Sequence, residues 1–269
     1  MRLRISHTTV YHYDPPASGA IQLLRLTPRN HDGQYVVRWR IDVSPDARLS
    51  AREDAFGNMT HVFTANGPFP ELSVTVDGEV ETHISDGVVR GTVERFPPSL
   101  FLRETPLTQA DAAIADLAEG VRNTSDVATL SRLHLLLQRL HGEMAYDASL
   151  TNAPMNAAQA FAIRRGVCRD LTHIFIAAAH CLAIPARYVA GYLKLADGAA
   201  DRREAGHAWA EAFVPDLGWV GFDPANGVCP TEAHVRVAIG LDSLGAAPVR
   251  GTRYGICTES LQVAIQVAQ

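Results

Sequence analysis

The feature that most constrains the fold is an apolar stretch between Gly166 and Pro185. From Leu171 to Ile184 almost every residue is apolar, which is typical of a helix packed on most of its sides. Gly166 can adopt backbone angles closed to other residues, and Pro185 disfavours helical angles in the residue before it. We therefore expect a buried helix around which the rest of the chain is organised.

Cys168 lies at the first turn of this predicted helix. Unpaired backbone N–H groups and the positive end of the helix dipole meet there, and both favour a thiolate over a thiol. The same N–H groups could also receive an oxyanion. A cysteine in an apolar helix is more often an inert core residue, and Cys181 fits that description. Cys168 differs because it begins the helix, so it is the candidate nucleophile.

Two strands after the helix carry a histidine and an aspartate. Residues 186–193 form a β-branched and aromatic run that is typical of a strand. In the next run, 206–214, alternation places three alanines on one face and, on the other, His207, Trp209, Glu211 and Phe213. Residues 215–218 form a turn, and 219–224 return antiparallel and include Asp223. The order Cys, His, Asp suits a nucleophile, a base and a group that orients the base.

The register of these two strands decides whether His207 and Asp223 meet. A slip of one residue turns every side chain to the other face of the sheet. With Asp223 opposite Trp209, His207 is its diagonal neighbour and within reach of a hydrogen bond. We therefore expect an odd-residue turn or a bulge at 215–218, with Gly218 supplying the permissive angles. In the other register, Asn226 would be the next candidate to orient the histidine.

Four motifs resemble the transglutaminase-like superfamily, which has a papain-like core, and in particular its bacterial members described as cysteine proteases. They are Gly-Val-Cys-Arg-Asp at 166–170, Ile-Pro-Ala-Arg-Tyr-Val at 184–189, Gly-His-Ala-Trp at 206–209 and Gly-Trp-Val-Gly-Phe-Asp-Pro-Ala-Asn-Gly at 218–227. The resemblance implies that Cys168 is the nucleophile, His207 the general base and Asp223 the residue that fixes the imidazole.

The resemblance also implies a side-chain oxyanion donor upstream of the nucleophile. Tyr146 is the candidate for this role, and a structural tyrosine is an equal alternative. Trp209 and Asn226 are further candidates for positioning the substrate, although Trp209 is more typical of an aromatic core.

The first third of the chain has the pattern of an antiparallel β-sandwich, with short strands separated by turns at 8–12-residue spacing. It resembles the β-domain that precedes the core in the same bacterial proteins, through residues 25–29 and 54–58. We expect an α+β fold: an N-terminal β-sandwich domain at 1–97, then a transglutaminase-like catalytic core at 98–269 with helices packed on an antiparallel sheet and C-terminal strands. The β-sandwich shows no site of its own, which favours a scaffold over a substrate-selecting module.

Further elements are predicted by local patterns. Helices are expected at 108–119, with Thr108 as N-cap and Gly120 as stop, at 126–144 and at 153–163. Later strands are expected at 235–239 and 258–267, with a turn at 248–251.

Composition excludes several classes of function. The 269 residues carry a net charge of −5, which offers no electrostatic footprint for nucleic acid or an anionic membrane. The first residues lack the apolar core of a signal peptide, so we expect a cytoplasmic protein. His173, His180 and Cys181 could suggest zinc, but no acidic residue follows at helical spacing. We expect neither a metal nor a cofactor, and the oligomeric state stays open.

The chemistry expected is acyl transfer on a peptide, protein or amide substrate through an acyl-enzyme. Hydrolysis is favoured because water is always present, whereas a transglutaminase needs an acceptor site for an amine. A non-catalytic interaction protein that keeps the fold is a second class of hypothesis, but it would be expected to have lost a triad residue. A peptide N-glycanase-like deglycosylase is a third, and no glycan-binding module is apparent.

Overall fold

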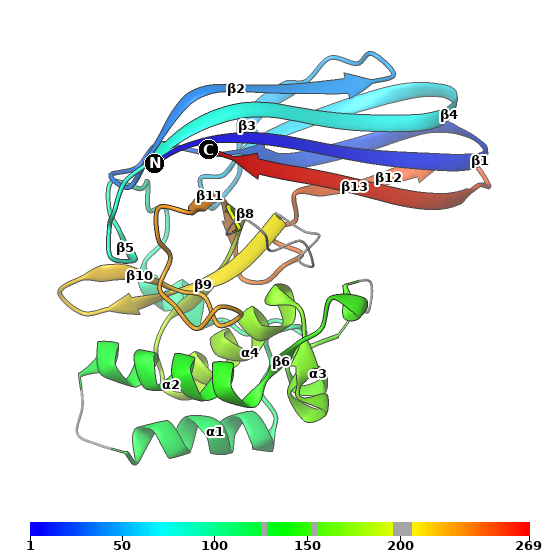
Figure 1. Cartoon of the computed structure of the whole chain (residues 1–269). Coiled ribbons are helices and arrows are strands. Elements are labelled where there is room, and N and C mark those ends of the chain that lie inside the picture. The colour runs from blue at the N-terminus through cyan, green and yellow to red at the C-terminus, as the bar shows by residue number, and fades with distance from the viewer. Residues whose placement is uncertain (125–127, 152–154, 196–205) are drawn as a thin grey trace.

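The protein consists of three layers (Figure 1). The computed structural model describes residues 1–124, 128–151, 155–195 and 206–269. A group of helices covers one face of a small sheet, and a β-sandwich lies over the other side of that sheet. The expected α+β class is confirmed. Among the described residues, no helix combines the length and the apolar character needed to cross a membrane.

The predicted buried helix is α4, Cys168–Cys181, and most of its residues are inaccessible to solvent. Around it pack α1 (Ala112–Arg122), α2 (Thr129–Glu143) and α3 (Ala157–Ile163). Its remaining side is covered by strand β9, whose alanines share one hydrophobic cluster with the helix. Alanine on that face lets helix and sheet approach closely, which leaves the larger side chains of β9 for its other face.

The core sheet has the strand order β11-β8-β9-β10-β5 in the described part of the chain. Its members are β8 (Ala186–Leu193), β9 (Gly206–Val214), β10 (Gly218–Phe222), β11 (His234–Gly240) and the short β5 (Val88–Val89). All of these pairs are antiparallel. Short elements before α4 are η1 (Pro98–Leu102), η2 (Ala148–Leu150) and the parallel pair β6 (Ala145–Tyr146) and β7 (Arg165–Gly166).

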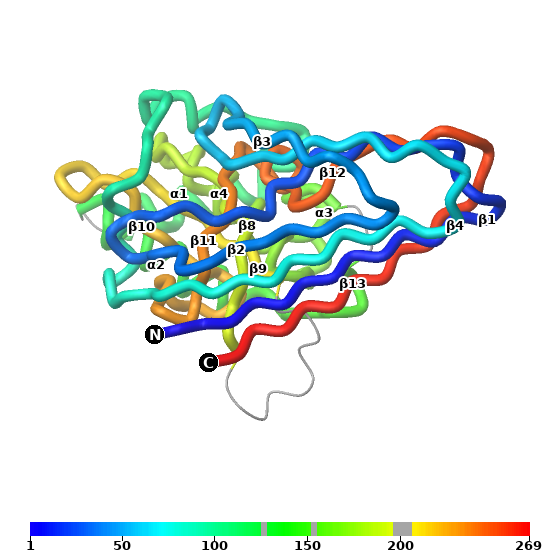
Figure 2. The backbone as a smooth tube through the Cα atoms, turned by 90° about the horizontal axis from the view of Figure 1, so that it is seen from above, coloured from blue at the N-terminus to red at the C-terminus, as the bar shows by residue number. Residues whose placement is uncertain are grey.

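The β-sandwich is one sheet folded over on itself. Its two central strands, β1 (Arg2–Thr27) and β4 (Met59–Thr82), pair along their length, with register shifts between His12 and Ala17. Both strands turn at one end of the molecule and return (Figures 1 and 2). The two halves then face each other across a separate hydrophobic cluster that includes Leu24, Phe63 and Leu72. The sequence patterns predict several short strands in this region, whereas β1 and β4 are each one continuous strand.

The outer strands of the sandwich come from both ends of the chain. β2 (Gln34–Ser44) and β3 (Ser50–Glu53) pair with β4, whereas β12 (Val249–Tyr254) and β13 (Thr258–Ala268) pair with β1. We expected the C-terminal strands within a core at 98–269, and this placement was wrong. The long outer edge of β1 has unpaired backbone groups that must be covered, and the last two strands cover them.

Smaller expectations also differ from the structure. Helix α1 begins at Ala112 because the Asp111 side chain accepts a hydrogen bond from the Ile114 N–H, and Gly120 lies inside the helix instead of ending it. Residues 249–254 form a strand where a turn was expected at 248–251. The expected starts of the helices at 126 and 153 lie outside the described residues.

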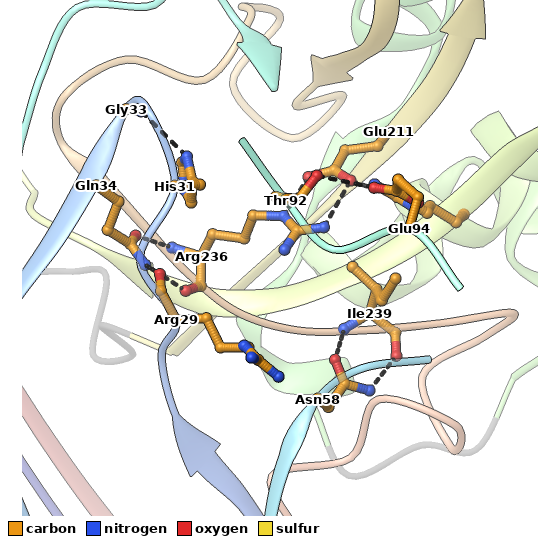
Figure 3. A network of polar contacts seen from close by, with 11 residues as sticks. Arg29, His31, Gly33, Gln34, Asn58, Thr92, Glu94, Glu211, Arg236 and Ile239 are labelled. Carbon is orange, nitrogen blue, oxygen red and sulfur yellow. Dashed lines mark hydrogen bonds and ion pairs between the residues drawn. The ribbon is translucent and has the colours of Figure 1, made fainter. Parts of the chain in front are cut away.

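Polar side chains join the sandwich to the core (Figure 3). The Asn58 amide accepts from the Ile239 N–H and donates to its carbonyl, at 2.8 Å in both directions. The Gln34 amide bonds in the same two-way manner to the backbone of Arg236, at 2.8 and 2.9 Å. Leu3 and Ile5 of β1 belong to the same hydrophobic cluster as α4. The two parts of the chain are therefore packed together and not merely linked.

A buried carboxylate, Glu211, lies at the centre of this junction. It is fully inaccessible and accepts hydrogen bonds from Arg187 and Arg236, each at 2.7 Å. Arg187, itself fully buried, also bonds to Glu94 at 2.6 Å. Burial would raise the pKa of Glu211, but the two guanidinium groups lower it to about 2. The carboxylate therefore stays charged and holds two arginines in place.

We predict that Glu211→Gln destabilises the fold by about 3–5 kcal/mol, because it removes the buried negative charge that Arg187 and Arg236 share. The free energy of unfolding from urea titration measures the effect. Asp42→Asn is the matched control, since the Arg40–Asp42 pair is exposed and such pairs contribute about 0–1 kcal/mol. Equal effects of the two substitutions would contradict a central role for Glu211.

Candidate active site

Cys168 begins α4, as predicted, and the residue is buried, with 9% of its surface exposed. The first turn of the helix is held from both sides. The Asp170 carboxylate accepts from the Val167 N–H at 3.1 Å, and the Thr172 hydroxyl donates to the Cys168 carbonyl at 2.7 Å. A carboxylate in the first turn also complements the helix dipole. The backbone that carries the thiol is thus firmly positioned.

The predicted register of β9 and β10 is confirmed. Gly218 pairs with Val214 and Phe222 with Ala210, so the next residue, Asp223, comes opposite Trp209. The connecting turn has three residues between the strands, and Gly218 has a φ of +87°, an angle that glycine tolerates. As a result the Asp223 carboxylate lies 2.7 Å from His207 Nε2.

Asp223 is fully buried and accepts an unusually large number of hydrogen bonds. Its Oδ1 accepts from the backbone N–H groups of Ala225 and Asn226, at 3.1 and 3.3 Å. Its Oδ2 accepts from His207, from the Asn226 amide at 2.6 Å and from His234 at 3.1 Å. Burial would raise the pKa of Asp223, but these hydrogen bonds hold it far below its usual value. A fixed carboxylate results.

His234 is the residue of this site that sequence reasoning missed. The Thr231 backbone N–H donates to His234 Nδ1 at 3.1 Å, so the remaining nitrogen, Nε2, carries the proton that it donates to Asp223. Asp223 is thereby held between two histidines. A lone histidine at the start of a predicted strand gives no local signal for this role, because the contact depends on where β11 lies relative to Asp223.

His207 completes the arrangement. Its Nε2 is engaged by Asp223, which leaves Nδ1 as its other ring nitrogen, and both His207 and Cys168 line one cavity. Burial would lower the pKa of His207, but the hydrogen bonds to Asp223 and Cys168 and their negative charges raise it to about 10. The imidazolium form is therefore favoured at neutral pH, and it can hold a thiolate as an ion pair.

The structure places the remaining candidates as follows. The Trp209 ring is buried and lies against the rings of His207 and His234, with centroids 6.2 and 5.3 Å away. Asn226 bonds to Asp223, so it belongs to the site as a support for the carboxylate. Tyr146 pairs through its backbone with Gly166, two residues before Cys168. Its role as oxyanion donor stays a prediction.

His173 and His180, which were considered as zinc ligands, contact different parts of the chain. His173 Nε2 accepts from the Ser243 N–H at 3.1 Å, whereas His180 Nε2 lies near the Ala186 carbonyl. Among the described residues, a group with metal-ligand character does occur at His207, Asp223 and His234, whose ligand atoms lie within 4.8 Å of one another. The hydrogen bonds that both histidines make to Asp223 account for this grouping.

A cavity of about 370 Å³ opens beside the candidate nucleophile. Cys168 and His207 line it together with residues of the β-sandwich and of the segment between β11 and β12. The thiol therefore borders both the triad and a space that a ligand can occupy.

Comparison with known proteins agrees with the geometry. Residues 3–81 match the family model of the bacterial transglutaminase-like N-terminal region, and residues 115–224 match that of the transglutaminase-like superfamily. Residues 115–224 are thus similar to the transglutaminase-like superfamily, and residues 3–81 to the N-terminal region found in its bacterial members. An uncharacterized protein of Mycobacterium leprae, ML0607, is 29% identical over 100% of this chain and 99% of its own length. An uncharacterized protein of Mycobacterium bovis, Mb2599c, is 26% identical over 94% of this chain and 88% of its own length.

A solved structure from Cytophaga hutchinsonii, described as a "Putative Cysteine Protease", has the same fold. It superposes with a TM-score of 0.79 at 21% identity and covers 100% of this chain and 90% of its own. The expected fold, with the transglutaminase-like core, is thus confirmed.

We predict that Cys168→Ala lowers the pKa of His207 from about 10, because the sulfur contributes a hydrogen bond and a negative charge that favour the imidazolium. NMR titration of ¹³C-labelled histidine measures the shift. Cys181→Ala is the matched control, since Cys181 lies at the far end of α4. An unchanged His207 titration in the Cys168 variant would show that the two side chains are not coupled.

Proposed function

We propose that the protein catalyses cysteine-dependent acyl transfer on an amide or peptide bond, most simply as a peptidase or amidase. The observation that carries the proposal is that His207, bonded to the buried Asp223 at 2.7 Å, lines the same cavity as Cys168, which begins α4. Cys168, His207 and Asp223 suit the roles of nucleophile, acid–base and orienting group. The match of residues 115–224 to the transglutaminase-like superfamily and the likeness in fold to a solved structure described as a putative cysteine protease support the same chemistry.

The reaction follows from the placement of these groups. The Cys168 sulfur attacks the substrate carbonyl, and the S–C bond forms as the carbonyl oxygen becomes an oxyanion near the N-terminus of α4. The carbonyl reforms as the C–N bond breaks, and His207 donates its proton to the leaving amine. Water then attacks the thioester and gives a proton to His207, which releases a carboxylic acid and restores the thiolate–imidazolium pair.

Asp223 acts by holding the imidazole and does not itself transfer a proton. Its carboxylate keeps one proton of His207 on Nε2, which leaves Nδ1 to exchange a proton with the sulfur and the substrate. The further hydrogen bonds from Asn226 and His234 keep the carboxylate in one orientation. Preorganised groups of this kind reduce the reorganisation needed as charge develops in the transition state.

A transglutaminase that uses an amine acceptor is the principal alternative, because the acyl-enzyme is the same in both reactions. A transglutaminase must also bind a lysine at an acceptor site, whereas water needs none, so hydrolysis is the simpler reaction. A non-catalytic interaction protein is a weaker alternative, because selection for binding alone would not require a buried carboxylate that orients a histidine towards a thiol.

We predict that Cys168 is the most reactive thiol, because burial raises the pKa of Cys181 and Cys229 while His207 faces Cys168. Mass spectrometry after brief treatment with iodoacetamide at neutral pH should find most of the label on Cys168. Predominant label on Cys181, Cys229 or Cys257 would overturn the assignment.

Turnover of a fluorogenic peptide panel tests the chemistry. Cys168→Ala and His207→Ala should each lower kcat/KM by about 10⁴-fold or more, whereas Asp223→Ala should leave measurable residual activity. The double variant of Cys168 and His207 should be no worse than either single variant, because the two act as a unit. A double variant far worse than both would exclude a shared step.

We predict that hydrolysis is the main outcome of the acyl-enzyme. Product analysis by mass spectrometry, with and without a primary amine at millimolar concentration, separates free acid from amide product. Free acid should predominate in both conditions if water has unhindered access to the thioester. Amide as the major product would instead establish the transferase reaction.

A further inference from the structure

The cavity beside Cys168 is built by distant parts of the chain. The core contributes Ala190 and Ala208, which lie on β8 and β9. The sandwich contributes Leu26 of β1 and Ile265 of β13, and the segment after β11 contributes Leu244. Ile265 comes within 3.0 Å of the position that a Cβ would occupy on Gly206, directly before His207. The sandwich is therefore a wall of the candidate active site.

The chemistry of the cavity is largely apolar. Of the two arginines that line it, Arg25 is paired with Asp54 at 2.9 Å and Arg169 with Asp170 at 3.0 Å. No carboxylate occurs among the described residues of its lining. His7 also lines it, and burial lowers the pKa of His7 to about 4, so this side chain is uncharged at neutral pH. Its ring nitrogens are bonded to the hydroxyls of Tyr192 and Thr9, both at 3.0 Å.

We propose that this cavity binds the acyl part of the substrate, that the group it selects is compact and apolar, and that the β-sandwich supplies the selectivity. The proposal rests on acyl transfer at Cys168 and names the class of acyl donor: amides or peptides with an apolar side chain beside the scissile carbonyl. An apolar cavity of about 150 Å³ holds benzene, so about 370 Å³ accepts a phenyl-sized or branched aliphatic group. The sandwich is thus more than the scaffold that its sequence suggested.

Alkyl chloromethyl ketones of increasing chain length test the cavity without any need for turnover. The Cys168 sulfur displaces chloride and forms a thioether, while the alkyl group occupies the acyl side of the site. Each buried methylene should raise the second-order rate of inactivation by roughly threefold to fourfold until the cavity is full. A chain of equal length that ends in a carboxylate or an ammonium group should react at least about tenfold more slowly, because its charge would be buried unpaired.

Substitutions in the cavity wall test whether the sandwich causes the dependence of the inactivation rate on chain length. The readout is the ratio of the rates for the hexyl and methyl reagents, so that any general change in thiol reactivity cancels. Ile265→Asn should reduce this ratio about tenfold or more. Leu261→Asn is the matched control: it lies on the same strand and is 54% exposed, and it is absent from the cavity lining. Leu244→Asn tests the cavity from its other wall, the segment after β11, with a residue that is also 54% exposed, so its folding is not at risk.

The outcomes separate this proposal from the proposed function. Inactivation rates that do not depend on chain length, a preference for charged chains, or a ratio in Leu244→Asn equal to that in Leu261→Asn would each overturn the cavity proposal. Length-dependent inactivation supports the cavity proposal even if the protein turns over no amide. A lack of amide turnover would overturn only the proposed acyl transfer. Turnover of peptides irrespective of the side chain beside the scissile carbonyl would leave acyl transfer intact and overturn the selectivity.

Discussion

A single buried carboxylate organises the candidate site. Because Asp223 is inaccessible to water, its charge must be balanced by hydrogen bonds from the protein. Those bonds come from β9 through His207, from the turn after β10 through Asn226 and from the start of β11 through His234. Three segments are therefore fixed relative to one another by one side chain. The position of the imidazole beside Cys168 is a consequence of that arrangement.

Much of this site could be predicted because its determinants are local. The helix start at Cys168 follows from Gly166 and the apolar run, and the facing of His207 and Asp223 follows from a short turn whose length sets the register. His234 could not be found in this way. It lies on β11, which pairs with β8 and not with β10, so its approach to Asp223 depends on the complete sheet order, which no local pattern records.

The fold shows the same division between local and long-range information. Alternation of apolar residues predicted the strands of the sandwich, but not that β1 and β4 are continuous through a bend. Nor did it indicate that residues 258–268 would pair with residues 4–14. Strand pairing over such a separation in sequence is decided by which edges must be covered. The C-terminal strands, expected in the core, belong to the sandwich for this reason.

The groups proposed to react and the wall of the cavity come from different parts of the sequence. The groups proposed to react are held by α4, β9, β10 and β11, all between residues 168 and 240. The cavity wall, in contrast, includes Leu26 from the first strand and Ile265 from the last, and Ile265 is held there by the pairing of β13 with the start of β1. The hydrogen bonds of Asp223 do not involve either residue. Substitutions in β13 can therefore reshape the cavity while the thiol, the imidazole and the carboxylate keep their geometry.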